Sequence, residues 1–282
     1  MRSIVSLLVA VTAAVTAVPG RAASFNFSTG NPDGLIGTLS RPASTGKLET
    51  ETADDFVLSQ ATRLDSATFT GLIPAGASLS GSARVEIEFY HVFPVDSTNP
   101  PSGHLATRVN APSDGEIVSA MRDSLVGSLG FTTTLLTSSF TVSNTGVNGI
   151  NASPNQFTGG EGAATGQEVQ FNVTFTTPLF LPADHYFFRP EVGLSSGNFL
   201  WLSASKPIVA PGTPFASDLQ SWISNSNLSP DWERIGTDIT HQGPFNATFS
   251  LTGETVPLPA AAWSGLALLA GLGLAKLWRR RC

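Results

Sequence analysis

The chain has 282 residues and a formal charge of −6 at pH 7, from 21 acidic and 15 basic residues. Six basic residues lie in 1–23 and 256–282, so residues 24–255 hold nine basic and all 21 acidic residues, a charge of −12. This acidity argues against nucleic acid and anionic phospholipid as partners. The single cysteine is Cys282, which excludes a disulfide within 24–255 and leaves the fold to a hydrophobic core.

The first 23 residues have the parts of a secretory signal peptide. Arg2 supplies a positive charge, 4–18 form an apolar run, and Gly20-Arg21-Ala22 puts small residues where signal peptidase reads the chain. We therefore predict cleavage by signal peptidase after Ala22 or Ala23. The apolar run is too short for a lasting membrane span.

Between the two ends, hydrophobic and polar residues alternate with the period of a β-strand. The alternation is clearest in three segments: 84–92, 168–175 and 245–251. Five less regular segments have the composition of strands: 53–58, 67–73, 132–142, 186–194 and 199–203. Gly- and Pro-rich turns separate the segments, and no βαβ rhythm or fixed-period repeat occurs. The pattern predicts an all-β fold, an antiparallel, jelly-roll-like β-sandwich over 24–252.

Three other segments bear on the organisation of the chain. Residues 217–223 favour two helical turns, with Ser217 as the N-cap. The stretch 148–166, 19 residues long, is the best candidate for an internal break, so one sandwich and two β subdomains both stay open. Residues 253–259 are expected to form a spacer and a terminal motif.

Three patterns suggest an enzyme, and each lacks the context that catalysis requires. A G-x-S-x-G pattern around Ser195 precedes a predicted strand, whereas a nucleophile elbow needs a helix there. Glu86 and Glu88 share a strand face, which is typical of a solvated face rather than of a glycosidase pair. The four histidines stand at least 13 residues apart and form no zinc motif: His91, His104, His185 and His241. We therefore expect no catalytic residue and no metal site.

One acidic pair raises the alternative of a calcium site. Asp54 and Asp55 precede a hydrophobic run, and Asp33 or Asp123 would complete a set of the hard oxygen ligands that Ca²⁺ prefers. Adjacent residues of a strand point to opposite faces, however, and do not chelate one ion together. The main expectation is no cofactor.

Two aromatic residues raise the alternative of a carbohydrate-binding module. Trp222 and Trp232 lie in the last third of the chain. If their rings are exposed, they would stack on sugar rings. The competing interpretation is that they pack against the sheet.

The C-terminus combines a short motif, an apolar segment and a basic end. Residues 260–278 contain one charge, Lys276, and as a helix they would span roughly 28 Å, close to the thickness of the hydrocarbon core of a bilayer. The basic end marks the cytoplasmic side and consists of Arg279, Arg280 and Arg281. Two prolines keep the preceding motif extended, and its residues are Val256, Pro257, Leu258 and Pro259.

This tail resembles the PEP-CTERM sorting signal in its VPLPA form. The resemblance implies recognition near 256–259 by an exosortase, a membrane-embedded sorting enzyme of Gram-negative bacteria. The rest of the chain resembles, more loosely, the β-sandwich ectodomains found ahead of such tails. This second resemblance implies a surface or extracellular-matrix protein of a polysaccharide-producing bacterium, and it assigns no catalytic residues.

Together, these patterns predict an exported, non-enzymatic protein of the cell surface or the biofilm matrix. Before processing, the helix 260–278 would hold it in the inner membrane. Signal peptidase, an exosortase and exopolysaccharide are the expected partners. The alternatives are a plain C-terminal anchor, a carbohydrate-binding module and, third, a secreted glycosidase or esterase.

Overall fold

The computed structural model describes residues 22–79, 83–94, 100–148, 150, 156–208 and 218–257, and Ser24–Thr255 forms one compact unit. Across these ranges, no helix has the length and apolar character needed to cross a membrane. Several predicted features lie outside the described residues: 1–21, Ser217, Leu258, Pro259, the expected helix 260–278, Arg279, Arg280 and Arg281.

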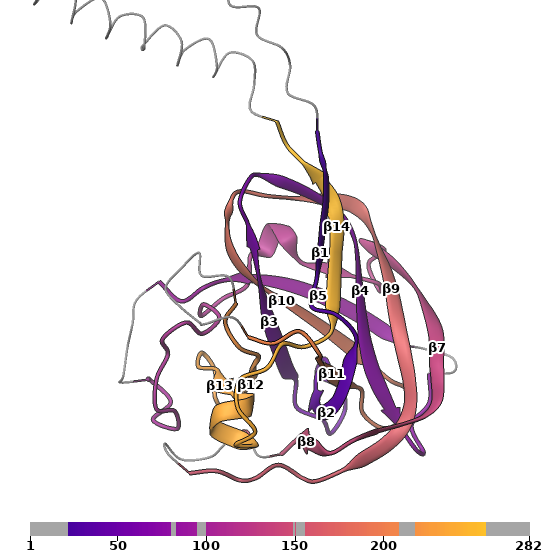
Figure 1. Cartoon of the computed structure of the whole chain (residues 1–282), viewed down its shortest axis with the longest axis vertical. Helices are drawn as coiled ribbons and strands as arrows, with labels where there is room; N and C mark the ends of the chain where they lie inside the picture. The colour runs from indigo at the N-terminus through magenta and orange to yellow at the C-terminus, as the bar shows by residue number, and fades with distance from the viewer. Residues whose placement is uncertain are drawn as a thin grey trace, which may run out of the picture. The chain divides into compact units, whose positions relative to one another are not determined.

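The unit consists of two β-sheets (Figure 1). The eight-stranded sheet contains β1 (Ser24–Ser28), β14 (Phe249–Thr255), β4 (Thr62–Pro74), β11 (Leu200–Ala204), β2 (Pro32–Leu39), β8 (Asn144–Gly146), β9 (Ala164–Leu181) and β7 (Leu129–Val142). The six-stranded sheet has the order β13 (Glu233–Arg234), β12 (Trp222–Asn225), β3 (Thr50–Leu58), β10 (Asp184–Gly193), β5 (Arg84–His91) and β6 (Arg122–Asp123). A 3₁₀ turn at Val118–Ala120 and a π-helical turn at Ile235–Ile239 are the helical elements of the described residues.

The all-β prediction is confirmed, and one ladder departs from the antiparallel pattern. β2 pairs with β8 in parallel, with Ile36 opposite Asn144, whereas the other named ladders are antiparallel. The chain changes sheet between β3 and β4, between β4 and β5, and again between β9, β10 and β11. Successive strands therefore contribute to both layers.

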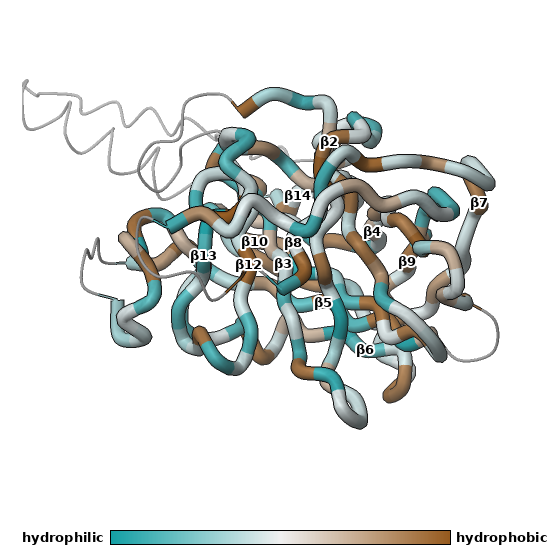
Figure 2. The backbone as a smooth tube through the Cα atoms, turned by 90° about the horizontal axis from the view of Figure 1, so that it is seen from below, coloured by the Kyte–Doolittle hydropathy of each residue, from teal (hydrophilic) through white to brown (hydrophobic). Residues whose placement is uncertain are grey.

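The main core lies between the inner faces of the two sheets. Phe56, Phe89 and Phe188 from the six-stranded sheet belong to one buried cluster with Trp201 and Phe249 from the other sheet. The rings of Phe188 and Phe249 stack across the interface with centroids 5.0 Å apart. In Figure 2, hydrophobic stretches along β4 and β9 alternate with paler ones, as expected for strands with one face in this core.

One glycine allows an aromatic ring to approach the backbone of β4. A Cβ atom at Gly71 would lie 1.9 Å from the ring of Phe199. Beside it, the indole N–H of Trp201 donates to the carbonyl of Thr248 at 2.8 Å. The absence of a side chain at Gly71 therefore lets the ring of Phe199 pack against the backbone of β4.

The predicted helix at 217–223 is wrong, because Trp222–Asn225 forms strand β12. Trp222 pairs with Ala53 of β3 and is 1% exposed. The segment thus forms the ladder and buries its large apolar side chain, and this tertiary pairing outweighs a weak local preference for helix.

The predicted break at 148–166 begins after β8 and ends within β9, and both strands belong to the eight-stranded sheet. On either side of it, β7 and β9 pair directly, with Val142 opposite Ala164. Ile150 within the segment is 2% exposed and packs in a core cluster with Ile36. The described part of Ser24–Thr255 belongs to one compact unit.

The two ends of this unit lie side by side. β1 pairs with β14, so that Ser24 is opposite Glu254 (Figure 1). β14 continues to Thr255, which pairs with Thr62 of β4. The residues 253–255, expected to be a spacer, are therefore part of strand β14, because β1 and β4 pair with them on either side.

Candidate functional site

Buried charged side chains surround Arg189 on the outer face of the six-stranded sheet. Arg189 belongs to β10, and its side chain is 2% exposed. Its Nη2 lies 2.6 Å from Glu88 Oε2 and 3.2 Å from Glu51 Oε1. Its Nη1 lies 2.7 Å from Glu191 Oε1 and 3.8 Å from Glu49 Oε1. One guanidinium group therefore faces four carboxylates on β3, on β5, on β10 itself and in the segment before β3.

This arrangement corrects the expectation of a solvated face on β5. Glu86, Glu88 and Tyr90 are 8%, 5% and 5% exposed. A cluster that includes Trp222 and Trp232 packs over Tyr90 and covers this side of the sheet. The sequence pattern identified the face correctly, but the covering segments come from distant parts of the chain.

The excess of carboxylates changes their protonation. Burial raises the pKa of Glu191 to about 8, with Arg189 opposing the shift. Burial also raises the pKa of Glu86 to about 7 and that of Glu51 above its ordinary value. Tyr90 donates its hydroxyl hydrogen to Glu88 at 2.7 Å. Near neutral pH, the carboxyls of Glu191 and Glu86 are therefore protonated to a greater extent than exposed glutamates.

A pocket of about 300 Å³ opens beside this charged group. Its walls include the carboxylates Glu49, Glu51, Asp114 and Glu116, and none of the described residues that line it is basic. The volume is at the lower end of the range for small-molecule sites, and the charge favours cationic occupants or hydrogen-bond donors.

The two tryptophans of the predicted glycan site are buried at this position. Trp222 and Trp232 are 1% and 3% exposed, so neither presents a ring face to solvent in this structure. Trp232 lines the pocket and packs edge-on against Tyr90, with centroids 5.3 Å apart. The Nε1 of Trp222 has no hydrogen-bond partner among the described residues.

The acidic pair of the calcium hypothesis anchors the backbone. Asp54 accepts a hydrogen bond from the N–H of Ala247 at 2.8 Å. Asp55 accepts one from the N–H of Leu219 at 2.9 Å and lies 2.6 Å from His185 Nε2. Burial raises the pKa of both carboxyls. From opposite faces of β3, both side chains also bind the stretch 219–221, because Ser221 donates its hydroxyl hydrogen to Asp54 at 3.2 Å.

The proposed calcium partners are engaged elsewhere. Asp33 accepts a hydrogen bond from Ser203 at 2.5 Å, and Asp123 accepts one from Arg84 at 2.7 Å. In the described ranges, no group of three or more His, Cys, Asp or Glu residues is arranged to hold a metal ion.

The enzyme patterns do not form a catalytic arrangement among the described residues. Ser195 lies after β10 and donates to the carbonyl of Ser78 at 3.2 Å, and strand β11 follows it. His91 lies 3.1 Å from Asp184 on the surface. Glu86 and Glu88 form ion pairs with Arg84 and Arg189.

The predicted processing sites flank the folded unit. Ala22 and Ala23 are exposed and immediately precede β1. Val256 is 40% exposed and, with Pro257, immediately follows β14.

Comparison with known proteins identified no relative. The chain matches no protein-family model, and neither the curated proteins nor the solved structures contain a significant match.

Proposed function

We propose that this chain is an exported, non-enzymatic β-sandwich protein that its terminal segments deliver to the cell surface or the extracellular matrix. The supporting observation is that the limits of the folded unit agree with the processing sites predicted from the sequence. The folded unit spans Ser24–Thr255. The sequence pattern places signal cleavage directly before this range and the VPLP motif directly after it. On this proposal the terminal segments direct transport, and the sandwich is the delivered product.

The surfaces next to these boundaries suit processing enzymes. Ala23 and Val256 are exposed, and a protease or transpeptidase needs an extended, accessible segment. Both boundaries also lie at one end of the sandwich, because Ser24 of β1 pairs with Glu254 of β14. As a finer class for the fold, we propose a jelly-roll-like sandwich, because the chain passes repeatedly from one sheet to the other.

The test follows the protein through the native host. A tag inserted at Gly46, an exposed turn where a Cβ would meet nothing within 4 Å, allows detection without touching either end. The intact mass of the tagged protein is expected to match a chain that begins at Ala23 or Ser24, after signal cleavage, and ends near 256–259. This species is expected at the cell surface or in the medium.

A double variant, Pro257→Ala with Pro259→Ala, is expected to remain in the inner membrane with its end at Cys282. The matched control is Pro101→Ala, which changes an exposed loop proline. A wild-type protein that stays in the inner membrane with an intact tail contradicts sorting and favours a plain anchor.

A second candidate function is carbohydrate binding by the delivered sandwich. A hydroxyl-lined groove on the eight-stranded sheet supports it. The third alternative, an esterase or glycosidase, has no comparable support. Hydrolysis of a nitrophenyl ester that is lost in Ser195→Ala would revive it.

A further inference from the structure

Two adjoining pockets form a groove on the outer face of the eight-stranded sheet. They have volumes of about 500 Å³ and about 530 Å³, and Thr68 of β4 borders both. Each volume falls within the range of ligand sites in proteins. Because the pockets share a wall residue, an extended ligand would contact both in succession.

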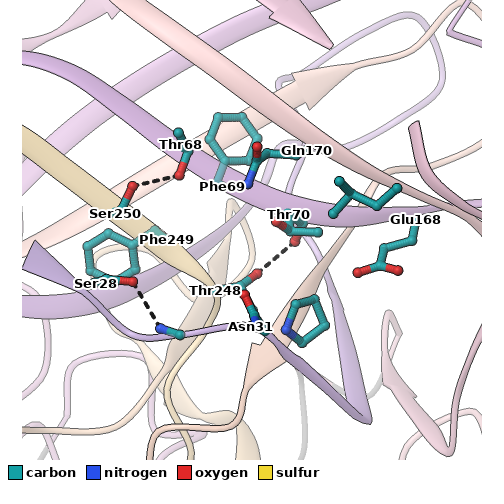
Figure 3. Close-up of a pocket in the computed structure, with 13 residues that line it drawn as sticks. Ser28, Asn31, Thr68, Phe69, Thr70, Glu168, Gln170, Thr248, Phe249 and Ser250 are labelled. Atoms are coloured by element: carbon teal, nitrogen blue, oxygen red, sulfur yellow. Dashed lines mark hydrogen bonds between the residues drawn. The ribbon is translucent and has the colours of Figure 1, made fainter. Parts of the chain in front are cut away.

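The groove is lined by hydroxyl and amide groups. Thr68 Oγ1 lies 2.6 Å from Ser250 Oγ, and Thr248 donates to the carbonyl of Thr70 at 2.9 Å (Figure 3). Each hydroxyl can both donate and accept a hydrogen bond. Amide side chains of Asn31, Gln170 and Asn172 add further donors and acceptors to the lining. A ligand that carries many hydroxyl groups matches this lining.

Among the described residues that line the two pockets, Glu168 is the single ionisable one. It is 7% exposed, yet its carboxylate makes no hydrogen bond or ion pair with the described residues. Figure 3 shows the side chain extending from β9, with no dashed line to the other residues drawn. Its oxygens are not among the buried unpaired side-chain atoms of the described residues, so they open into the pocket and can accept hydrogen bonds from a bound donor.

The charge of the site distinguishes between ligand classes. Residues 24–255 carry a net charge of −12, and Glu168 adds a negative charge inside the groove, so an acidic polysaccharide would be repelled. A carboxylate accepts hydrogen bonds from two neighbouring hydroxyl groups of a sugar ring. The surrounding neutral hydroxyl and amide groups complete the contacts without requiring a charged ligand.

We propose that this groove binds a segment of neutral polysaccharide and that Glu168 accepts hydrogen bonds from its vicinal hydroxyl groups. The proposal rests on the carbohydrate-binding candidate given above and assigns it a site. It places the sugar on the eight-stranded sheet, away from the pocket beside Trp232.

The test measures binding by the full chain, purified in detergent, to arrays of neutral, acidic and amino-sugar oligosaccharides. Calorimetry then gives the dissociation constant for the best neutral oligosaccharide. Glu168→Gln is expected to weaken binding about tenfold, because hydrogen bonds to a charged acceptor are lost. Thr68→Ala is expected to weaken it by a smaller factor. The matched control is Glu116→Gln, in the pocket beside Trp232 on the six-stranded sheet. It is expected to leave the dissociation constant unchanged.

Three outcomes would overturn the proposal. The first is the absence of binding to every neutral oligosaccharide. The second is equal binding by the wild type and by Glu168→Gln, provided that both melt at the same temperature. The third is binding of CaCl₂ alone that Glu168→Gln abolishes, which would assign the groove to a cation. If the protein is released normally but binds no glycan, only the proposed glycan site is refuted. If it binds glycan but stays in the inner membrane, only the proposed sorting function is refuted.

Discussion

Raising the pH is expected to destabilise the fold through Glu191. This carboxyl is 0% exposed, and burial raises its pKa from 4.5 to about 8. Because the folded state holds the proton more tightly than the unfolded state, the stabilisation is complete below the unfolded pKa and is lost as the pH rises through the folded one. With about 1.4 kcal/mol per pKa unit, Glu191 alone lowers the free energy of unfolding by about 3 kcal/mol between about pH 5 and about pH 8.

The variant Glu191→Gln isolates this effect. Gln keeps the size of the side chain and an oxygen acceptor for Arg189, but it does not ionise. Between about pH 5 and about pH 8, the free energy of unfolding of the variant is expected to fall by about 3 kcal/mol less than that of the wild type. Urea denaturation followed by tryptophan fluorescence at several pH values measures the slopes.

The control is Glu254→Gln, at a carboxyl whose side chain is 52% exposed. Its slope is expected to match that of the wild type. If Glu191→Gln and the wild type show the same pH slope, Glu191 is ionised throughout and forms an ordinary ion pair with Arg189. Burial and excess negative charge would then not raise the pKa of Glu191 in the folded protein.

Three further changes test the packing, with urea denaturation as the measurement. Gly71→Ala is expected to cost about 3 kcal/mol, because the new methyl group would meet the ring of Phe199; a stability equal to the wild type would show that the ring moves freely. Trp201→Phe removes a buried hydrogen bond and leaves a cavity, so about 2–3 kcal/mol is expected to be lost; an unchanged midpoint would show that neither contributes. Asp54→Ala leaves the N–H of Ala247 without its acceptor and is expected to cost about 2 kcal/mol and to expose 218–248 to limited proteolysis; unchanged cleavage would contradict the anchoring role.

The strands could be predicted because their signal is local. Alternation with period two marks β5 and β9, and the predicted inward residues Val85 and Phe171 are both buried in the core. The segment 217–223 was mispredicted because its state depends on pairing with β3, which lies far earlier in the chain. Local preferences carry no information about such a partner.

The candidate sites were harder to predict, since their chemistry depends on burial. The sequence placed Glu88 on the polar face of its strand but gave no sign that Arg189, on a strand distant in sequence, would face it. Glu168 likewise falls on the polar face of β9. Its burial depends on neighbouring segments, including the β1–β2 connection that supplies Asn31. Sequence patterns assign a residue to a face, whereas the environment of that face requires the three-dimensional structure.

The position of β14 also has a mechanical consequence. The last strand lies between β1 and β4 rather than at an edge, and its final residue, Thr255, pairs with Thr62. If the chain is held beyond Thr255, tension acts along the strand axis, perpendicular to the hydrogen bonds of both ladders. The bonds on both sides then bear the load together in shear, instead of opening one after another as in peeling. A sandwich tethered at this end would therefore resist flow or traction as a single block.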